Sequence, residues 1–382
     1  MNCNKLTSRR LVGILLVLLA VVCFTAVPVF AAEIKIGLIT SLTGPVSTYG
    51  QSVNNAVQMA VDEINAAGGI NGHKINLVVR DDKGDATEAA NVTRYFIDRE
   101  QVALIVGPVI TPCVMAAAPI AQEAGMPLIT PTATADTITA IGDYIFRAAF
   151  KDSLQGSAMA RFARENLGLN TAAIIYDIAN DYSVGLMNEF KKTFEELGGR
   201  VLTTQSYTTG DRDFSAQLTS ILIANPQCLF IPDYHSAAGP ILLQASQFGI
   251  SAVKLGVDGW DSPDLKPLSG GNDEGGYFIN HYSPYDTRPA TQEFVNKYRS
   301  KYGEDPDALA ALGYDAMQIV RAALAQANST DPVAIRDALG AVKGVTAATA
   351  DIDMDPEGTP YKPLVIVQIK DGAAVLVDKV YP

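Results

Sequence analysis

Short β-rich runs alternate with stretches of helical periodicity along most of the chain, and this alternation constrains the fold more than any other feature. Ile34–Ile39 is typical of a buried strand, and Ser52–Ala67 places its apolar residues on one helical stripe. Ile75–Arg80 has the pattern of the next strand. A repeat of strand, helix and strand predicts a parallel sheet with helices on both faces.

The alternation restarts near Asp152, so we expect two α/β units of similar size. A helix over Asp152–Asn166 and a strand over Ala172–Tyr176 open the second unit. No Gly/Ser-rich linker separates the units, which favours two closely coupled lobes. The late part of the chain is mainly helical and ends in two predicted strands, Leu364–Lys370 and Ala373–Val377. Two lobes also fit 382 residues, since one domain typically takes about 100–200.

The first 31 residues predict a secretory signal peptide. Basic residues precede the apolar run Leu11–Phe24, and small residues before the expected cut after Ala31 suit a signal peptidase. The apolar run is shorter than the about 20 residues that a membrane-spanning helix needs. Lipoprotein cleavage before Cys23 is the weaker alternative, because Val22 stands where such motifs have Gly, Ala or Ser. We therefore expect a mature protein in the periplasm.

The charge and the cysteines exclude several classes of protein. The chain carries 29 basic and 41 acidic residues, and it has no basic stripe that would attract nucleic acid. Of the four cysteines, Cys113 and Cys228 remain after signal cleavage, and we expect both to be buried free thiols. No cysteine or histidine has metal-ligand spacing, so no metal is expected.

The motifs of common enzymes are absent from the sequence. It contains no dinucleotide-binding, phosphate-loop, serine-hydrolase or zinc-protease signature, so we expect no cofactor and no catalysis. His73 and His281 are predicted at the surface, and His235 follows a strand end without a catalytic partner. The acidic segment after Asp351 fails as a calcium loop, because Pro356 occupies the place of the turn glycine.

Two loops that follow predicted strands have the chemistry of a binding site. The loop 107–113 follows the strand Val102–Val106, and the loop 130–136 follows Leu128–Ile129. Ligands of open parallel sheets bind beyond the carboxyl ends of the strands. The hydroxyls and the free N–H groups at helix N-termini would suit a small carboxylate, although ordinary helix capping explains the same residues.

Four segments carry a resemblance to a known family: 44–50, 66–72, 129–134 and 211–215. In order and spacing they resemble the leucine/isoleucine/valine-binding proteins of bacterial ABC transporters, over about residues 33–382. The resemblance implies two Rossmann-like lobes, joined by three crossover hinge segments, that close on a ligand. It places residues 32–150 and 281–357 in the N-terminal lobe and residues 151–280 and 358–382 in the C-terminal lobe. The crossovers are then expected near Phe150, Asn280 and Glu357.

The resemblance also assigns roles to single residues. Hydroxyls that bind a ligand carboxylate fall on Thr111 and Thr134, and the carbonyl that accepts the ammonium falls on Thr132. The acidic partner of the ammonium, a Glu in the family, falls on Asp258. The expected ligand site as a whole comprises Tyr49, Ile110, Thr111, Thr132, Thr134, Tyr182, Tyr234, Asp258 and Trp260.

Several positions depart from the family pattern. The small disulfide of the family matches Gly84 and Ile110, so it is absent. Asp258 is one methylene shorter than Glu, and Leu309 stands where the family often has an aromatic ring. Trp260 either enters the pocket or packs within its lobe; the sequence leaves both open. The pocket is thus expected to differ from that of a leucine binder.

The resemblance implies a periplasmic solute-binding protein that binds an amino acid and delivers it to an ABC permease in the inner membrane. We expect it to be a monomer that binds neither nucleic acid nor a cofactor. One alternative is the same fold binding another carboxylate, such as an aromatic acid, with Asp258 facing water or a hydroxyl. The other is a secreted hydrolase or lyase that uses Asp258 and His235, although no nucleophile is spaced to match them.

Overall fold

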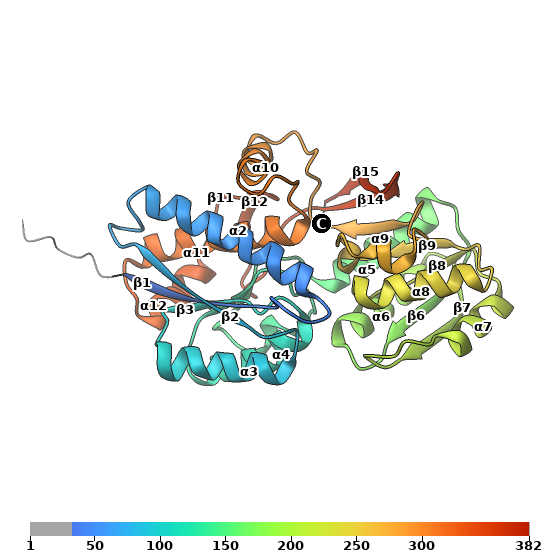
Figure 1. Cartoon of the computed structure of the whole chain (residues 1–382), viewed down its shortest axis with the longest axis horizontal. Helices are drawn as coiled ribbons and strands as arrows, with labels where there is room; N and C mark the ends of the chain where they lie inside the picture. Colours follow the sequence, from blue (N-terminus) through green and yellow to red (C-terminus); the bar gives the residue numbers. More distant parts are fainter. Residues whose placement is uncertain (1–32, 382) are drawn as a thin grey trace, which may run out of the picture.

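A computed structural model describes residues 33–381, and the expected signal peptide lies outside these residues. The described chain forms two lobes that lie side by side (Figure 1), and each lobe contains a sheet with helices on both faces. None of the helices in residues 33–381 has the length and hydropathy that crossing a membrane would need. The alternation of strands and helices that the sequence predicts is therefore confirmed as a two-lobed α/β fold.

The sheet of the N-terminal lobe contains five parallel strands in the order β2-β1-β3-β4-β5. Ile36 of β1 lies opposite Leu77 on one side and Leu104 on the other, which fixes the register of the central strands. The strands are β1 (Ile34–Thr40), β2 (Ile75–Asp81), β3 (Leu104–Val106), β4 (Leu128–Thr130) and β5 (Ile145–Arg147).

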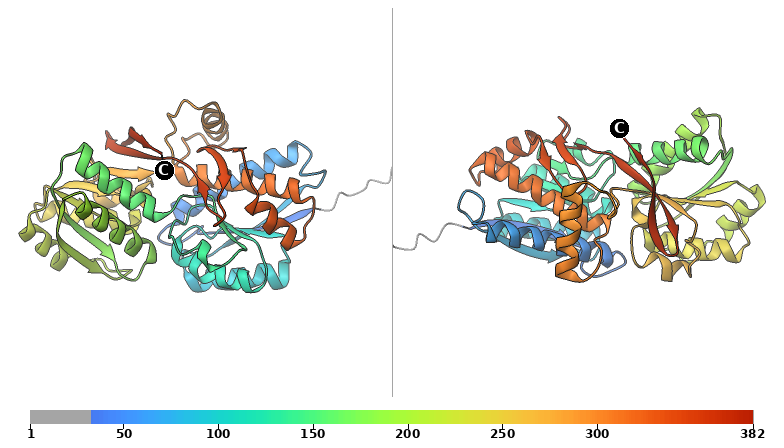
Figure 2. Two further views of the ribbon diagram at one scale, coloured as in Figure 1. Left: turned by 180° about the vertical axis from the view of Figure 1, so that it is seen from behind. Right: turned by 90° about the horizontal axis from the view of Figure 1, so that it is seen from above.

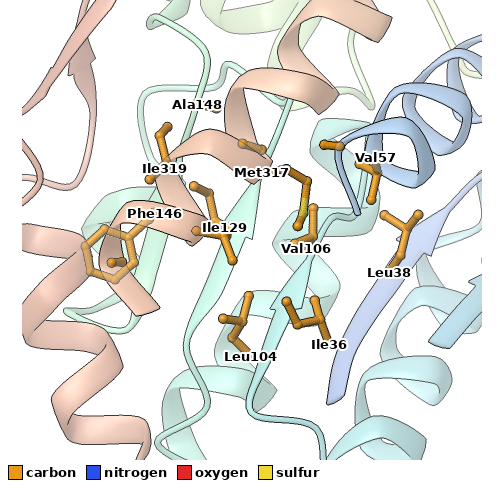
Figure 3. Close-up of a cluster of buried hydrophobic side chains, with 14 of the residues drawn as sticks. Ile36, Leu38, Val57, Leu104, Val106, Ile129, Phe146, Ala148, Met317 and Ile319 are labelled. Atoms are coloured by element: carbon orange, nitrogen blue, oxygen red, sulfur yellow. The ribbon is translucent and has the colours of Figure 1, made fainter. Parts of the chain in front are cut away.

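Helices from distant parts of the sequence cover this sheet. Helices α2 and α11 pack on each other over one face, while α3 and α4 cover the other (Figure 1). Figure 3 shows Ile36, Val106 and Ile129 of the sheet against Val57 of α2 and Met317 of α11. The helices of this lobe are α2 (Ser47–Ala66), α3 (Ala86–Tyr95), α4 (Thr111–Glu123), α10 (Pro289–Tyr302), α11 (Ala308–Ala327) and α12 (Pro332–Gly340).

The sheet of the C-terminal lobe contains seven strands in the order β15-β14-β10-β9-β8-β6-β7. The five strands from β10 to β7 are parallel, and β14 and β15 add to their edge in antiparallel pairing. The strands are β6 (Thr171–Asp177), β7 (Arg200–Tyr207), β8 (Cys228–Phe230), β9 (Val253–Gly256), β10 (Tyr277–Asn280), β14 (Leu364–Lys370) and β15 (Ala373–Val380). The helices are α5 (Asp152–Arg161), α6 (Asp181–Glu196), α7 (Ser215–Ala224), α8 (His235–Gln247) and α9 (Leu265–Ser269).

The chain passes between the lobes three times: from β5 to α5, from β10 to α10, and from β13 to β14. Strand β13 (Pro360–Tyr361) belongs to a small antiparallel sheet of the N-terminal lobe with β11 (Val345–Thr346) and β12 (Asp351–Met354). The third passage therefore follows Tyr361. Figure 2 shows how the late, orange-to-red part of the chain contributes to both lobes.

Candidate ligand site between the lobes

A cavity lies between the two lobes, where strands of both sheets end. Loops that follow β3 and β4 line it from the N-terminal lobe, and loops that follow β6, β8 and β9 line it from the C-terminal lobe. The space between the lining side chains is about 290 Å³, part of which is open to solvent. The lining residues are Tyr49, Val109, Ile110, Thr111, Thr132, Ala133, Thr134, Tyr182, Tyr234, Asp258, Gly259 and Leu309.

Hydrogen bonds hold together the two loops of the N-terminal lobe. The Thr130 hydroxyl donates to the carbonyl of Pro108 at 2.7 Å, and the Thr132 hydroxyl donates to the carbonyl of Val109. Gly107 begins the first loop with φ +99°, and a Cβ there would lie 2.0 Å from the carbonyl oxygen of Ile39. Glycine is therefore required where the loop leaves β3.

Thr111 is the first residue of α4 and presents an unpaired hydroxyl to the cavity. Its side chain is 1% exposed, and its Oγ1 has no hydrogen-bond partner among the described residues. The preceding residue, Ile110, makes no side-chain cap, so the N–H groups of Thr111 and Cys113 have no side-chain partner within residues 33–381, while Pro112 between them has no N–H. An N-terminus of this kind, with a hydroxyl beside it, is suited to a carboxylate.

Tyr234 offers a second unpaired hydroxyl from the C-terminal lobe. Its oxygen is buried near the Asn180 side chain and the Thr111 backbone, but it forms no well-aligned hydrogen bond with either. A buried hydroxyl without a partner costs about 1–3 kcal/mol. The two unpaired hydroxyls, Thr111 and Tyr234, therefore indicate that a polar ligand group completes the site.

Asp258 supplies a carboxylate at the other side of the cavity. It opens the short 3₁₀ helix Asp258–Trp260 directly after β9 and is 8% exposed. Its Oδ1 accepts a hydrogen bond from the Tyr182 hydroxyl, and its Oδ2 lies 2.9 Å from Nε2 of His281. Its backbone N–H donates to the side-chain oxygen Oε1 of Gln155 at 3.2 Å. These contacts fix the direction of the carboxylate.

His281 does not lie at the surface, as the sequence analysis predicted. It is 2% exposed, follows the end of β10, and stacks on Phe150 with ring centroids 3.8 Å apart. Burial lowers the pKa of the imidazole, which favours the neutral ring, and in that form an Nε2–H donates to the Asp258 carboxylate. The prediction was wrong because β10 was not recognised. Recognising Tyr277–Asn280 as a strand would have placed His281 directly after a strand end and so revealed its burial beside the cavity.

Asp152 is a second buried acid, behind the cavity, that the sequence analysis described only as a helix start. It is 1% exposed, and its Oδ1 accepts from the Gln155 amide at 3.3 Å, whereas its Oδ2 has no partner among the described residues. Burial, and then the nearby Asp258 carboxylate, raise the pKa of Asp152 well above its ordinary value. Burial beside a like charge therefore favours the protonated form of Asp152.

Tyrosine rings form the wall of the cavity and join the lobes. Tyr182 and Tyr234 stack with centroids 4.8 Å apart, and Tyr49 meets Tyr234 edge-on at 6.0 Å. The Tyr49 hydroxyl donates to the carbonyl of Gly259 in the other lobe and accepts from the N–H of His235 at 3.3 Å. These contacts across the cleft identify the arrangement as a closed form.

The structure brings all the expected site residues together around the cavity except Trp260. Trp260 is 1% exposed and packs in the core of the C-terminal lobe near Phe278, and its indole N–H donates to Ile231 at 3.1 Å. The expectation that Trp260 enters the pocket is therefore wrong, and the packing alternative holds. Cavity residues that the sequence analysis did not assign to the ligand site are Val109, Ala133, Gly259 and Leu309.

Comparisons with known proteins find relatives that match this chain over most of its length. A Pseudomonas aeruginosa leucine-, isoleucine-, valine-, threonine- and alanine-binding protein is 30% identical over 342 residues, which cover 89% of this chain and 90% of that protein. The crystal structure of a leucine binding protein, LivK, from Thermotoga maritima superposes with a TM-score of 0.88 at 36% identity, over 91% of this chain and 99% of that one.

Two further crystal structures share the fold. Streptococcus pneumoniae LivJ in complex with isoleucine has a TM-score of 0.85 at 32% identity. The match covers 90% of this chain and 99% of that one. A Rhodopseudomonas palustris solute binding protein in complex with benzoate has a TM-score of 0.83 at 22% identity, over 92% of this chain and 97% of that one. The family model described as periplasmic binding protein matches residues 33–374. Because this match spans nearly the whole described chain, the protein belongs to the periplasmic binding protein family and has its type I fold.

Proposed function

We propose that this protein is the solute-binding component of an ABC transporter and that it binds a branched-chain or related amino acid between its lobes. The observation that carries the proposal is the pairing, in one closed cavity, of the Asp258 carboxylate with the unpaired Thr111 hydroxyl at the N-terminus of α4. A buried ammonium needs a counter-charge, and a buried carboxylate needs several donors. An α-amino acid satisfies both.

Each group of the ligand has a proposed partner. The ammonium contacts Asp258 and the carbonyl of Thr132, and the carboxylate contacts Thr111, Thr134 and the first N–H groups of α4. The aliphatic side chain then faces Ile110, Leu309 and the tyrosine rings that line the remaining wall. The relatives named above as binders of leucine, isoleucine and valine support this assignment.

The proposed action is binding without chemistry. Asp258 is engaged by Tyr182 and His281, and neither neighbour is a nucleophile poised for catalysis. Cys113 is a buried free thiol, as the sequence predicted, and burial raises its pKa, which suppresses the reactive thiolate. These features do not favour the alternative of a secreted hydrolase.

We further propose that the lobes move as two bodies about the three passages. One body contains residues 33–150 and 281–361, and the other contains residues 151–280 and 362–381. Contacts such as Tyr49 to Gly259 and Thr48 to Ser262, whose hydroxyl oxygens are 3.0 Å apart, hold the closed form together. The closed form is the one that the membrane permease recognises.

The proposed compartment is the periplasm, where proteins of this family act. It rests on the signal-like pattern of residues 1–31, which lie outside the described part of the chain, and on the membership of the family. N-terminal sequencing of the exported protein checks the cleavage, with Ala32 as the expected first residue. Retention of Met1 would contradict it.

Two substitutions test the ligand assignment. Asp258→Ala leaves the ligand ammonium unpaired, and we expect it to weaken leucine binding by about 2–5 kcal/mol. Thr111→Val removes a donor to the carboxylate, and we expect it to cost about 1–3 kcal/mol. Calorimetric titration with leucine, isoleucine and valine measures both, and Asp98→Ala, at an exposed position on the N-terminal lobe, is the matched control.

The opposite result identifies a ligand without an amine. If benzoate binds the wild type, and Asp258→Ala binds it equally or better, Asp258 does not serve an ammonium. An α-amino acid that binds Asp258→Ala as tightly as the wild type refutes the proposed ammonium site. Mass spectrometry of the small molecule released from the purified protein by denaturation provides an independent identification.

A further inference from the structure

The closed form brings together two carboxyl groups from opposite lobes, outside the ligand cavity. Asp261 follows the 3₁₀ helix of the C-terminal lobe, and Asp307 is the N-cap of α11 in the N-terminal lobe. Oδ2 of Asp261 accepts the backbone N–H of Ala308 at 2.8 Å. The C-terminal lobe therefore helps to cap a helix of the N-terminal lobe, at the residue next to Asp307.

The two carboxyl groups share one helix N-terminus. Oδ1 of Asp307 accepts the N–H of Ala310 at 2.8 Å, and its Oδ2 accepts the Ser52 hydroxyl. Oδ2 of Asp261 also accepts the Asn280 amide at 2.9 Å. Both side chains are half-buried. A helix N-terminus stabilises one negative charge, but two half-buried carboxylates at the same N-terminus repel each other.

The groups that face this pair are acidic or neutral. In addition to burial, the charge of Asp258, in the 3₁₀ helix just before Asp261, raises the pKa of Asp261. Besides burial, the charge of Glu304, in the loop before α11, raises the pKa of Asp307. The remaining titratable groups that interact with the pair are the phenols Tyr49 of α2, Tyr282 after β10 and Tyr298 of α10. Burial, and then the charge of Asp261, raise the pKa of Asp307 to about 7, and burial also raises that of Asp261.

We propose that Asp261 and Asp307 form a proton-sensitive contact between the lobes, so that the closed form binds one more proton than the open form. Opening moves Asp261 away from Asp307 and returns both carboxyl groups to water. The inference rests on the proposed function, because the bound ligand is what closes the lobes. Since the closed form holds the extra proton, the ligand binds more tightly as the pH falls and more weakly as the pH rises toward and through about 7.

Leucine titrations at pH 6 and pH 8 test this linkage. We expect the wild type to bind about tenfold more weakly at pH 8, because one proton is linked to closure. Asp307→Asn keeps an N-cap residue and removes the like charge. We therefore expect it to bind several-fold more tightly than the wild type at pH 8 and to lose most of the pH dependence. A wild-type pH profile in Asp307→Asn would overturn the proposal.

Two control variants separate this pair from other acids. Asp305→Asn changes an exposed neighbour that pairs with Arg299, so its pH profile should match the wild type. Asp233 lies elsewhere in the C-terminal lobe and accepts a hydrogen bond from the Tyr207 hydroxyl. Burial raises the pKa of Asp233 to about 7 as well. If Asp233→Asn removes the pH dependence while Asp307→Asn retains it, the proton belongs to Asp233 and the proposal is wrong.

A measurement without ligand distinguishes failure of the contact from failure of the proposed function. The hydroxyl oxygens of Thr48 and Ser262 are 3.0 Å apart across the cleft, so Thr48→Cys with Ser262→Cys places two thiols to cross-link the closed form. In a glutathione buffer at pH 8, adding Asp307→Asn should increase the cross-linked fraction several-fold. An unchanged fraction overturns the proposal, whereas a wild type that binds no amino acid at either pH overturns only the proposed ligand.

Discussion

At the residue scale, two neighbours orient the short Asp258 side chain. The Tyr182 hydroxyl and the neutral His281 ring each hold one carboxylate oxygen, so the side chain has a fixed direction despite its length. The unpaired Nδ1 of His281 and its stacking on Phe150 agree with a ring that serves only to orient Asp258. Sequence reasoning found Asp258 and Tyr182, but not the contact between them or the part played by His281.

His281→Phe separates orientation from packing. Phenylalanine keeps a ring against Phe150 but removes the N–H donor to Asp258. A hydrogen bond to a charged group contributes about 1.5–3 kcal/mol, so we expect leucine affinity to fall by about that amount with little loss of thermal stability. Titration calorimetry and thermal unfolding measure the two effects. Unchanged affinity in His281→Phe would show that Tyr182 alone orients the carboxylate.

At the element scale, the sequence predicted most of the long helices and strands, but not where the functional ones begin. Helix α4 begins at Thr111, inside the segment 107–113 that the sequence analysis described as a loop. The short strands β5 and β10 were missed, because segments of 3 and 4 residues show too little periodicity. Both strands are specified by pairing with β4 and β9, which is a tertiary interaction.

At the scale of the whole molecule, the loops of the site are tied to the passages between the lobes. Arg147, just before the first passage, is fully buried and donates to the carbonyls of Thr134 and Ala135 at 2.7 and 2.8 Å. Asp152, just after it, donates its backbone N–H to Thr134 at 3.0 Å. The loop that carries Thr134 is therefore bonded directly to the first segment that joins the lobes.

Closure should be visible in solution. We expect saturating leucine to reduce the radius of gyration in small-angle scattering, because the three passages absorb a rigid-body rotation. Asp258→Ala, which binds the ligand weakly, should keep the larger radius at the same leucine concentration. A scattering curve that leucine leaves unchanged, although calorimetry shows binding to the wild type, would contradict the closing mechanism.

The sequence by itself determined the α/β class, the two lobes, and most of the residues around the cavity, because periodicity and the order of family segments are local properties of the chain. Only the tertiary structure decided that Trp260 packs in a core, that His281 contacts Asp258, and that Asp261 accepts the N–H of Ala308 in the other lobe. Each of these depends on segments that are brought together by β pairing or by closure of the lobes. Such contacts leave no periodic trace in the sequence, since their partners belong to different elements.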